Sequence, residues 1–206
     1  APLRSGTIRD SNSYQLAAQI ENLGITAINY GIVKDTSSEI QQAISTLEQK
    51  TDVILVSGGV SAGDYDMVPE EIKKAGYQII FHKVLIKPGM PLLFAVKNKK
   101  YCFGLPGNPV STFVQFEFLI KPFLHALMGG VFNPYQIMLP VAVDFNLKET
   151  DRDSIIPVKI ADGIIHPLEY HGSAHINALT YADGFIKIQR GLAVLKKGEL
   201  TDVRLI

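Results

Sequence analysis

Cysteine and long apolar stretches are scarce in this sequence. Its 206 residues contain a single cysteine, Cys102, which excludes an intramolecular disulfide and a metal site built from several cysteines. No apolar run approaches the roughly 20 residues that span a bilayer, and the first residues carry neither a secretion nor a lipidation signal. We therefore expect a cytoplasmic protein that is neither secreted nor inserted in a membrane.

An excess of charge of either sign is also missing. Twenty Lys and Arg residues balance 20 Asp and Glu residues, so no overall field attracts nucleic acid or an anionic membrane surface. Hydrophobic residues make up 47% of the chain and charged residues 19%, which is typical of a folded globular protein. Any anion site must be local, and residues 57–111 are modestly basic, with seven lysines and four acidic residues.

The first two-thirds of the chain alternates between helical and strand-like patterns. Apolar periodicity, caps and glycine stops predict four helices, of which the last is kinked or broken at Pro122: residues 12–23, 37–47, 69–75 and 109–128. Short β-prone runs predict strands between them: residues 25–30, 52–57, 78–86, 92–96 and 101–105. The six-residue aliphatic run at 52–57 is typical of a strand buried in a parallel sheet. The pattern predicts a three-layer αβα sheet, which binds ligands at the carboxyl ends of its strands.

The pattern changes after Gly129 to Pro134. Short alternating strands without a convincing helix follow, separated by Gly and Asp turns: residues 137–143, 154–160, 163–167, 184–188 and 202–205. We predict an α/β domain over residues 1–132, followed by a small all-β domain over 133–206. The second is expected to be a β-barrel or β-sandwich.

Glycine and small hydroxyl residues follow the predicted strand at 52–57. The segment "SGGVSAGDYD" lets the backbone approach a ligand closely, as a phosphate site requires, although a Gly-Gly pair is more often an ordinary tight turn. Two carboxylates beyond the glycines suit Mg²⁺, with a loop or helix-capping role as the alternative. The candidate residues are Ser57, Gly58, Gly59, Ser61, Gly63, Asp64 and Asp66.

Two further segments point to the same anion site. In "LPGNPVS", Asn108 can cap a helix whose first position is Pro109, which aims N–H groups at the ligand edge; a well-capped helix is the alternative. In "HKVLIKPGMP", Lys87 precedes a rigid Pro-Gly turn and can supply positive charge, although such a lysine is usually only a solvated strand end. The candidate residues of these segments are Lys87, Pro106, Gly107, Asn108, Pro109 and Ser111. The five histidines are assigned no metal, and Cys102 is expected to be an inert core residue.

"SGGVSAGDYD", "IKPGMP" and "LPGNPVS", in this order and at this spacing, resemble the C-terminal half of molybdopterin molybdenumtransferases, the MoeA and gephyrin E-domain family. "GSAHINALTYADGFI", at residues 172–186, resembles that family's last β domain, so the similarity covers essentially the whole chain. The resemblance implies molybdenum cofactor biosynthesis, in which molybdate is inserted into adenylylated molybdopterin with Mg²⁺-assisted release of AMP.

Carried over position by position, the resemblance assigns roles to the candidate residues. Gly58, Gly59, Ser61 and Asp66 match the pterin-phosphate and metal loop, with Asp64 as a second metal ligand. Lys87 matches the basic residue before Pro-Gly, and residues 106–109 with Ser111 match the second phosphate-facing loop. The implied mechanism is electrostatic: a metal ion on Asp66 polarises the phosphoanhydride while Lys87 and backbone N–H groups neutralise developing oxyanions.

Two departures from the family pattern qualify this assignment. Met90 stands where many relatives carry a second lysine, so molybdate attraction depends more on Lys87 or on residues elsewhere. The family's N-terminal domains, which drive homodimer formation and complete the active site, have no counterpart here, so we expect a fragment or a naturally short form. The alternatives are a molybdopterin adenylyltransferase-like enzyme, against which the β domain counts, and a non-catalytic scaffold that binds receptor peptides; an adenylyltransferase is also a possible partner.

Overall fold

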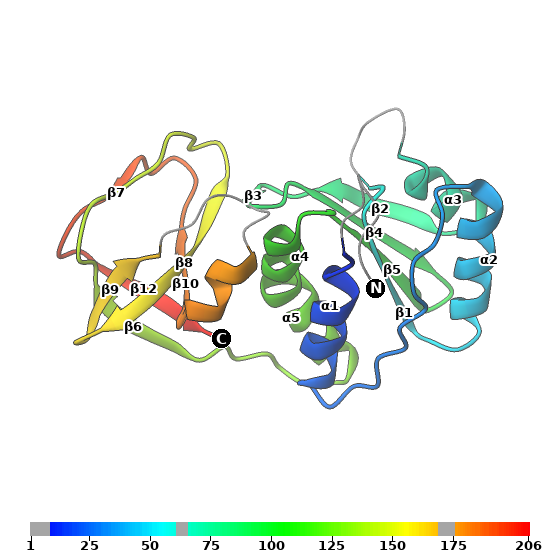
Figure 1. Cartoon of the computed structure of the whole chain (residues 1–206), viewed down its shortest axis with the longest axis horizontal. Helices are drawn as coiled ribbons and strands as arrows, with labels where there is room; N and C mark the ends of the chain where they lie inside the picture. Colours follow the sequence, from blue (N-terminus) through cyan, green and yellow to red (C-terminus); the bar gives the residue numbers. More distant parts are fainter. Residues whose placement is uncertain (1–8, 61–65, 169–175) are drawn as a thin grey trace. The chain divides into compact units, whose positions relative to one another are not determined.

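The computed structural model describes residues 9–60, 66–168 and 176–206 of the chain. Its contacts divide the protein into two compact units (Figure 1), the first formed by residues 1–83 and 91–116 and the second by residues 84–90 and 117–206. None of the helices in the described ranges has the length and apolar character needed to cross a membrane.

The first unit is built on a mixed β-sheet. The strand order is β1 (Val53–Ser57), β5 (Lys100–Leu105), β4 (Pro91–Lys97) and β2 (Gln78–Lys83). β1 runs parallel to β5, whereas β4 is antiparallel to both β5 and β2. Parallel pairing, which the aliphatic run at 52–57 predicts, is found between β1 and β5. β4 and β5 form a hairpin whose turn holds Asn98 and Lys99 at positive φ.

Helices cover both faces of this sheet (Figure 1), as the predicted three-layer fold requires. On one face lie α2 (Ser37–Glu48) and α3 (Val68–Lys74), whose buried Ile40, Ile44 and Ile72 pack with Ile54 and Leu93 of the strands. On the other, α4 (Pro109–Gln115) contacts β5, and α1 (Asn12–Glu21) contacts α4.

The helices begin close to the predicted residues, but the predicted side-chain caps at Thr36 and Asn108 do not form, and neither does one predicted strand. Asp10 caps α1, since its Oδ1 accepts a hydrogen bond from the Ser13 N–H at 3.1 Å. Thr36 precedes α2 and makes no side-chain cap. Its N–H, which the glutamate of a capping box would bind, donates instead to the Lys34 carbonyl at 2.7 Å. The predicted strand at residues 25–30 is wrong: this segment has β-prone residues but lies outside the described strands. A high β-propensity does not make a segment a strand when no neighbouring strand pairs with it.

The predicted break at Pro122 is confirmed. α4 ends at Gln115, a π-helical segment follows (η1, Phe116–Ile120), and α5 (Lys121–Leu127) begins one residue before the proline. Pro122 has no N–H to donate to the carbonyl one turn earlier, and a π segment is a common way to accommodate that loss.

The second unit is a β structure, as predicted for the last third of the chain. Its sheet has the order β3 (Ile86–Lys87), β8 (Asp153–Ala161), β10 (Gly184–Ile188), β12 (Leu200–Leu205) and β6 (Gln136–Pro140). β9 (Ile164–Pro167) pairs with β8, and a bridge between Val141 and Ile165 brings it to the end of β6, which closes the sheet like a barrel. β7 (Phe145–Asn146) and β11 (Val194–Leu195) form a separate pair.

Two details of this unit differ from the sequence predictions. A 3-10 helix, η2 (Ile176–Tyr181), lies where no helix was expected, because the buried Ala178 and Leu179 anchor a single short turn that carries no long periodicity. The predicted strand at 78–86 is divided, since β2 ends at Lys83 and β3 pairs with β8. The predicted domain boundary at residues 132 and 133 stays a prediction; by contacts, the chain passes between the units after residues 83, 90 and 116.

Candidate functional site

The carboxyl ends of β1 and β5 lie side by side in the first unit. The strands are parallel, and Ser57 at the end of β1 is paired with Leu105 at the end of β5. The segments that follow them, the glycine loop (residues 57–60 in the described part) and the proline loop (Pro106–Pro109), therefore leave the sheet at the same edge. The structure thus brings together two of the three predicted segments, at the edge where such sheets bind ligands.

The backbone of the glycine loop requires its glycines. Gly58 and Gly59 have φ of 90° and 66°, a region that other residues seldom adopt. A Cβ built on Gly58 meets no atom of the described residues within 4 Å, whereas one on Gly59 lies 3.0 Å from Cγ2 of Val68. Among the described residues Gly58 thus borders open space, and its N–H donates to the Leu105 carbonyl at 2.9 Å.

Val60 anchors the far end of the described glycine loop. Its side chain is only 1% exposed, and a Cβ built on Gly104 of β5 would approach its Cγ1 to 2.7 Å. Gly104 therefore leaves the space that Val60 fills. The carbonyl of Val60 also lies 2.8 Å from Nε2 of His82 on β2. Because a carbonyl only accepts, His82 must donate here, which is a supporting role that the histidine spacings did not indicate.

The carbonyl groups of the proline loop are turned toward the protein. The buried Thr112 hydroxyl donates to Pro106 O at 2.6 Å and to Asn108 O at 3.1 Å, and the Asn12 amide donates to Gly107 O at 2.9 Å. These peptide bonds are trans, so each following N–H points away from the carbonyl that these donors hold. The N–H groups of Gly107 and Asn108 are thereby directed away from Thr112 and Asn12, as an anion site requires.

Asn12 joins the two loops. Its Nδ2 lies 2.6 Å from Ser57 Oγ in the glycine loop and 2.9 Å from Gly107 O in the proline loop. The Ser57 hydroxyl in turn donates to Pro106 O at 3.3 Å. Asn12 was not among the predicted site residues, because a single asparagine at a helix start is common and does not by itself indicate a site.

One described carboxylate borders the glycine loop, and a second lies near it in the sequence. Asp66 lies two residues before α3, and Oδ1 of Asp35, just before α2, is 3.9 Å from a Cβ built on Gly59. Asp35 was also missed, since nothing in its local sequence connects it to the glycines. Within the described residues, which leave out Asp64, no group of three or more potential metal ligands is found. Metal binding therefore stays a prediction.

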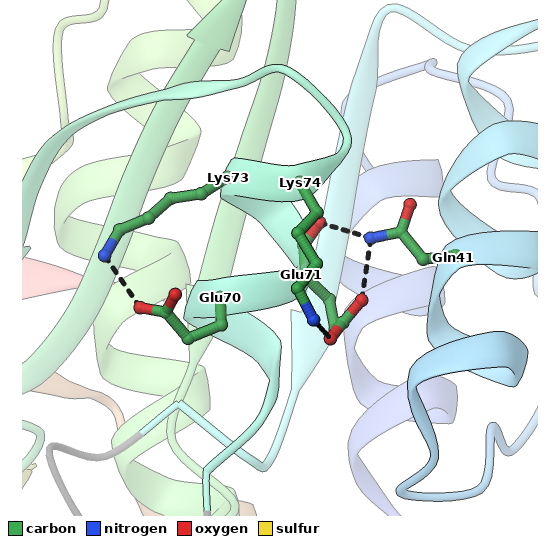
Figure 2. Close-up of polar contacts among 5 residues, drawn as sticks. All are labelled: Gln41, Glu70, Glu71, Lys73 and Lys74. Carbon is green, nitrogen blue, oxygen red and sulfur yellow. Dashed lines mark hydrogen bonds and ion pairs between the residues drawn. The ribbon is translucent and has the colours of Figure 1, made fainter.

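The helices that follow these carboxylates are held together by a buried acid, as Figure 2 shows. Gln41 of α2 donates to the backbone carbonyl of Glu71 at 2.6 Å and to its Oε2 at 2.8 Å, and Lys74 forms an ion pair with Oε1 at 2.7 Å. Hydrogen bonds from Lys74 and then Gln41 hold the pKa of Glu71 below its usual value. This arrangement fixes α3 against α2. The neighbouring pair of Glu70 and Lys73 is exposed and contributes little.

The remaining predicted site residues have different placements. Lys87 lies in β3 of the second unit, where its Nζ is 3.0 Å from Glu149, and it lowers the pKa of that carboxyl group. Its part in the anion site stays a prediction. Ser111 is buried in α4. Ser61, Gly63 and Asp64 lie outside the described residues.

Cys102 is confirmed as a core residue. It lies on β5, is 1% exposed, and packs in the core beneath α2 and α3. Burial raises the pKa of its thiol to about 12, so the reactive thiolate is essentially absent at neutral pH.

Two family models match successive parts of the chain. Residues 2–126 match a family model described as a probable molybdopterin binding domain, and residues 139–206 match the MoeA C-terminal region, domain IV. A molybdopterin molybdenumtransferase of Staphylococcus epidermidis is 31% identical over 206 residues, which is 98% of this chain and 49% of that protein. A protein of Methanocaldococcus jannaschii is 35% identical over 201 residues, 98% of this chain and 48% of that protein.

The fold comparison agrees. The crystal structure of a molybdopterin biosynthesis MoeA protein from Pyrococcus horikosii matches with a TM-score of 0.85 and 28% identity over 100% of this chain and 50% of that one. The chain thus spans about half the length of the relatives it matches. Both family models together account for nearly all of its sequence, and the chain belongs to the MoeA family of molybdenum cofactor biosynthesis proteins.

Proposed function

We propose that the glycine loop and the proline loop bind the pyrophosphate of adenylylated molybdopterin, and that this site supports molybdate insertion with release of AMP. One observation carries the proposal: both loops leave the carboxyl edge of the parallel β1–β5 pair and are joined there through Ser57 and Asn12. Two adjacent loops with backbone N–H groups suit two linked phosphates better than one. Membership of the MoeA family makes the pterin nucleotide the expected carrier of those phosphates.

The carboxylates fit a magnesium ion. Mg²⁺ prefers oxygen ligands and is usually held by one or two carboxylates together with substrate phosphates. Asp35 has such an oxygen beside the glycine loop, and we include Asp66, two residues before α3, and Asp64 as further candidates. When bound, the ion would polarise the phosphoanhydride and stabilise the charge that develops on the leaving phosphate.

The protein residues contribute position and charge. Gly58 lets the backbone reach the ligand without a side chain in the way, and the proline loop directs N–H groups outward. Fixed donors of this kind stabilise an oxyanion without having to reorganise during the reaction. We include Lys87 as a source of positive charge for molybdate, since Met90 supplies none.

Calorimetric titration with ADP and Mg²⁺ tests the proposal, because ADP carries the same pyrophosphate group. We expect saturable binding that weakens at least tenfold in Gly58→Val, whose side chain would fill the open space and strain the backbone. Ile80→Val on the exposed face of β2 is the control and should bind like the parent.

The location of bound ADP provides a second test. A crystal soaked with ADP should show density between the two loops. Density confined to the β unit, or Gly58→Val binding as tightly as the parent, would overturn the assignment. Incubation with adenylylated molybdopterin and molybdate should then release AMP in a Mg²⁺-dependent manner.

A further inference from the structure

The Asn12 amide is buried and only half satisfied. Its residue is 8% exposed, Nδ2 serves Ser57 Oγ and Gly107 O, and Oδ1 has no hydrogen-bond partner among the described residues. A buried acceptor without a donor costs about 1–3 kcal/mol. An apolar side chain of similar size would avoid that cost, so stability alone does not account for an asparagine here.

What the amide provides is a connection between loops that are distant in sequence. Asn12 is 45 residues from Ser57 and 95 from Gly107. The helix that carries it is held to α4 independently, since Gln19 of α1 donates to the Phe113 carbonyl at 3.5 Å. Asn12 is thus fixed by its helix, and both loops are fixed by Asn12.

The bond to Gly107 O also sets a direction. The carbonyl is held on the inner side, so the N–H on the same peptide plane points outward. Without the amide, the Gly107 carbonyl loses the donor that orients it, and the exposed Gly107 tolerates many backbone conformations. The Ser57 hydroxyl would likewise lose a partner that keeps it beside the proline loop.

We propose that Asn12 is a positioning residue that sets the distance between the two loops and thereby favours ligands with two linked phosphates over those with one. This inference rests on the proposed function, in which a pyrophosphate contacts both loops. A diphosphate needs both loops at a fixed separation, whereas a monophosphate needs only one of them. Asn12 itself does not contact the ligand, since it is buried behind the loops.

The test compares ADP and AMP as probes. Asn12→Asp keeps the shape of the side chain but places an oxygen where Nδ2 met Gly107 O, so the bridge is replaced by a repulsion. We expect its affinity for ADP to fall at least tenfold and its affinity for AMP by threefold or less. Gln19→Ala, which alters a contact of the same helix away from the loops, should leave both affinities unchanged. Equal losses for ADP and AMP, or no loss for either, would overturn the inference.

A second measurement needs no ligand. The Gly58 N–H donates to the Leu105 carbonyl next to the Asn12 bridge, so its hydrogen exchange should speed up about tenfold or more in Asn12→Asp, while amides of β4 keep their rates. An unchanged Gly58 rate would overturn the positioning role whether or not ADP binds. If the parent protein binds no ADP but the Gly58 amide exchanges faster in the variant, the proposed function and the ligand preference are contradicted. The role of Asn12 in connecting the two loops is then still supported.

Discussion

Each unit buries polar side chains, and one from each unit shows that such burial can serve opposite ends. Asn12 in the first unit and Arg204 in the second are both 8% exposed. Asn12 bridges two loops at the ligand edge and keeps an acceptor without a donor. Arg204 donates to the Glu117 carbonyl, and its guanidinium lies 4.4 Å from the ring centre of Phe118 and 4.9 Å from that of Phe132.

The difference indicates which groups were placed for stability and which for a ligand. Burial lowers the pKa of the Arg204 guanidinium, but a hydrogen bond and two aromatic faces compensate the cation for its lost water. Around Asn12 the loss of water is not fully compensated, because Oδ1 has no donor among the described residues. Asn12 lies at the edge of the sheet where the glycine loop and the proline loop converge. Buried polar groups that are left partly unsatisfied are a mark of function when they lie at such an edge.

The largest effect on stability should come from removing Arg204. Arg204→Ala loses a charge-assisted hydrogen bond and two desolvated cation–π contacts, so we expect the free energy of unfolding to fall by about 3 kcal/mol. Urea titration followed by circular dichroism measures it. Arg204→Lys keeps the charge without the planar face and should recover less than half of the loss. A loss below about 1 kcal/mol would contradict the conclusion that the buried Arg204 stabilises the second unit.

The next effect concerns activity. Asp66→Asn should lower the Mg²⁺-dependent hydrolysis of adenylylated molybdopterin about 10²-fold, the scale of losing one electrostatic contact to a transition state, with little effect on the unfolding temperature. The assay follows AMP release. Asp202→Asn, the same change at an exposed position of β12, is the control. Activity within about threefold of the parent would exclude a metal role for Asp66.

A packing change should connect stability to the glycine loop. Gly104→Ala places a methyl group 2.7 Å from Val60 Cγ1 and 3.2 Å from Leu93 Cβ, so we expect a loss of about 2 kcal/mol from overpacking. Val60→Ala makes room for the new methyl group, and the double variant should therefore lose less than the two single changes added together. If the losses in unfolding free energy are simply additive in a double-mutant cycle, Gly104 does not determine how the Val60 side chain packs.

The smallest effect is a pH dependence of stability. The pKa of Glu71 is lowered in the folded protein from its usual value of 4.5, mainly by Lys74. The carboxylate therefore adds stability that is fully present above about pH 4.5 and is lost as the pH falls through the folded-state pKa. The difference in unfolding free energy between the parent and Glu71→Gln should be largest near neutral pH and shrink below pH 4.5. A constant difference from pH 7 to pH 3 would contradict this.

The sequence predicted which edge of the sheet carries the candidate site, but not the residues that hold the loops together at that edge. The aliphatic run before Ser57 and the Gly-Pro chemistry of the proline loop are local signals, and a parallel strand pair necessarily brings their ends together. Asn12, His82 and Asp35 carry no such signal. Each reaches the loops from a segment distant in the sequence, and such an approach leaves no spacing that can be recognised in one sequence.

The same reasoning explains where the predicted fold differs from the structure. Residues 25–30 have strand propensity without a partner, and β3 has only two residues, too few for any pattern. The small barrel was predictable because its strands are long enough to show alternation. Its closure through Val141 and Ile165 was not, since one bridge decides it.

The two-residue strand β3 has a consequence for how this protein can be divided and how it folds. Residues 84–90 leave the α/β sheet, contribute β3 to the barrel beside β8, and return to begin β4. The barrel is therefore assembled from pieces of chain more than 60 residues apart, and its completion requires a long loop to close, which slows folding. A cut at residue 133 would also remove Phe118 and Phe132, the aromatic faces of Arg204. The MoeA C-terminal region is thus a recognisable sequence module that cannot be transplanted intact by cutting the chain at a single linker.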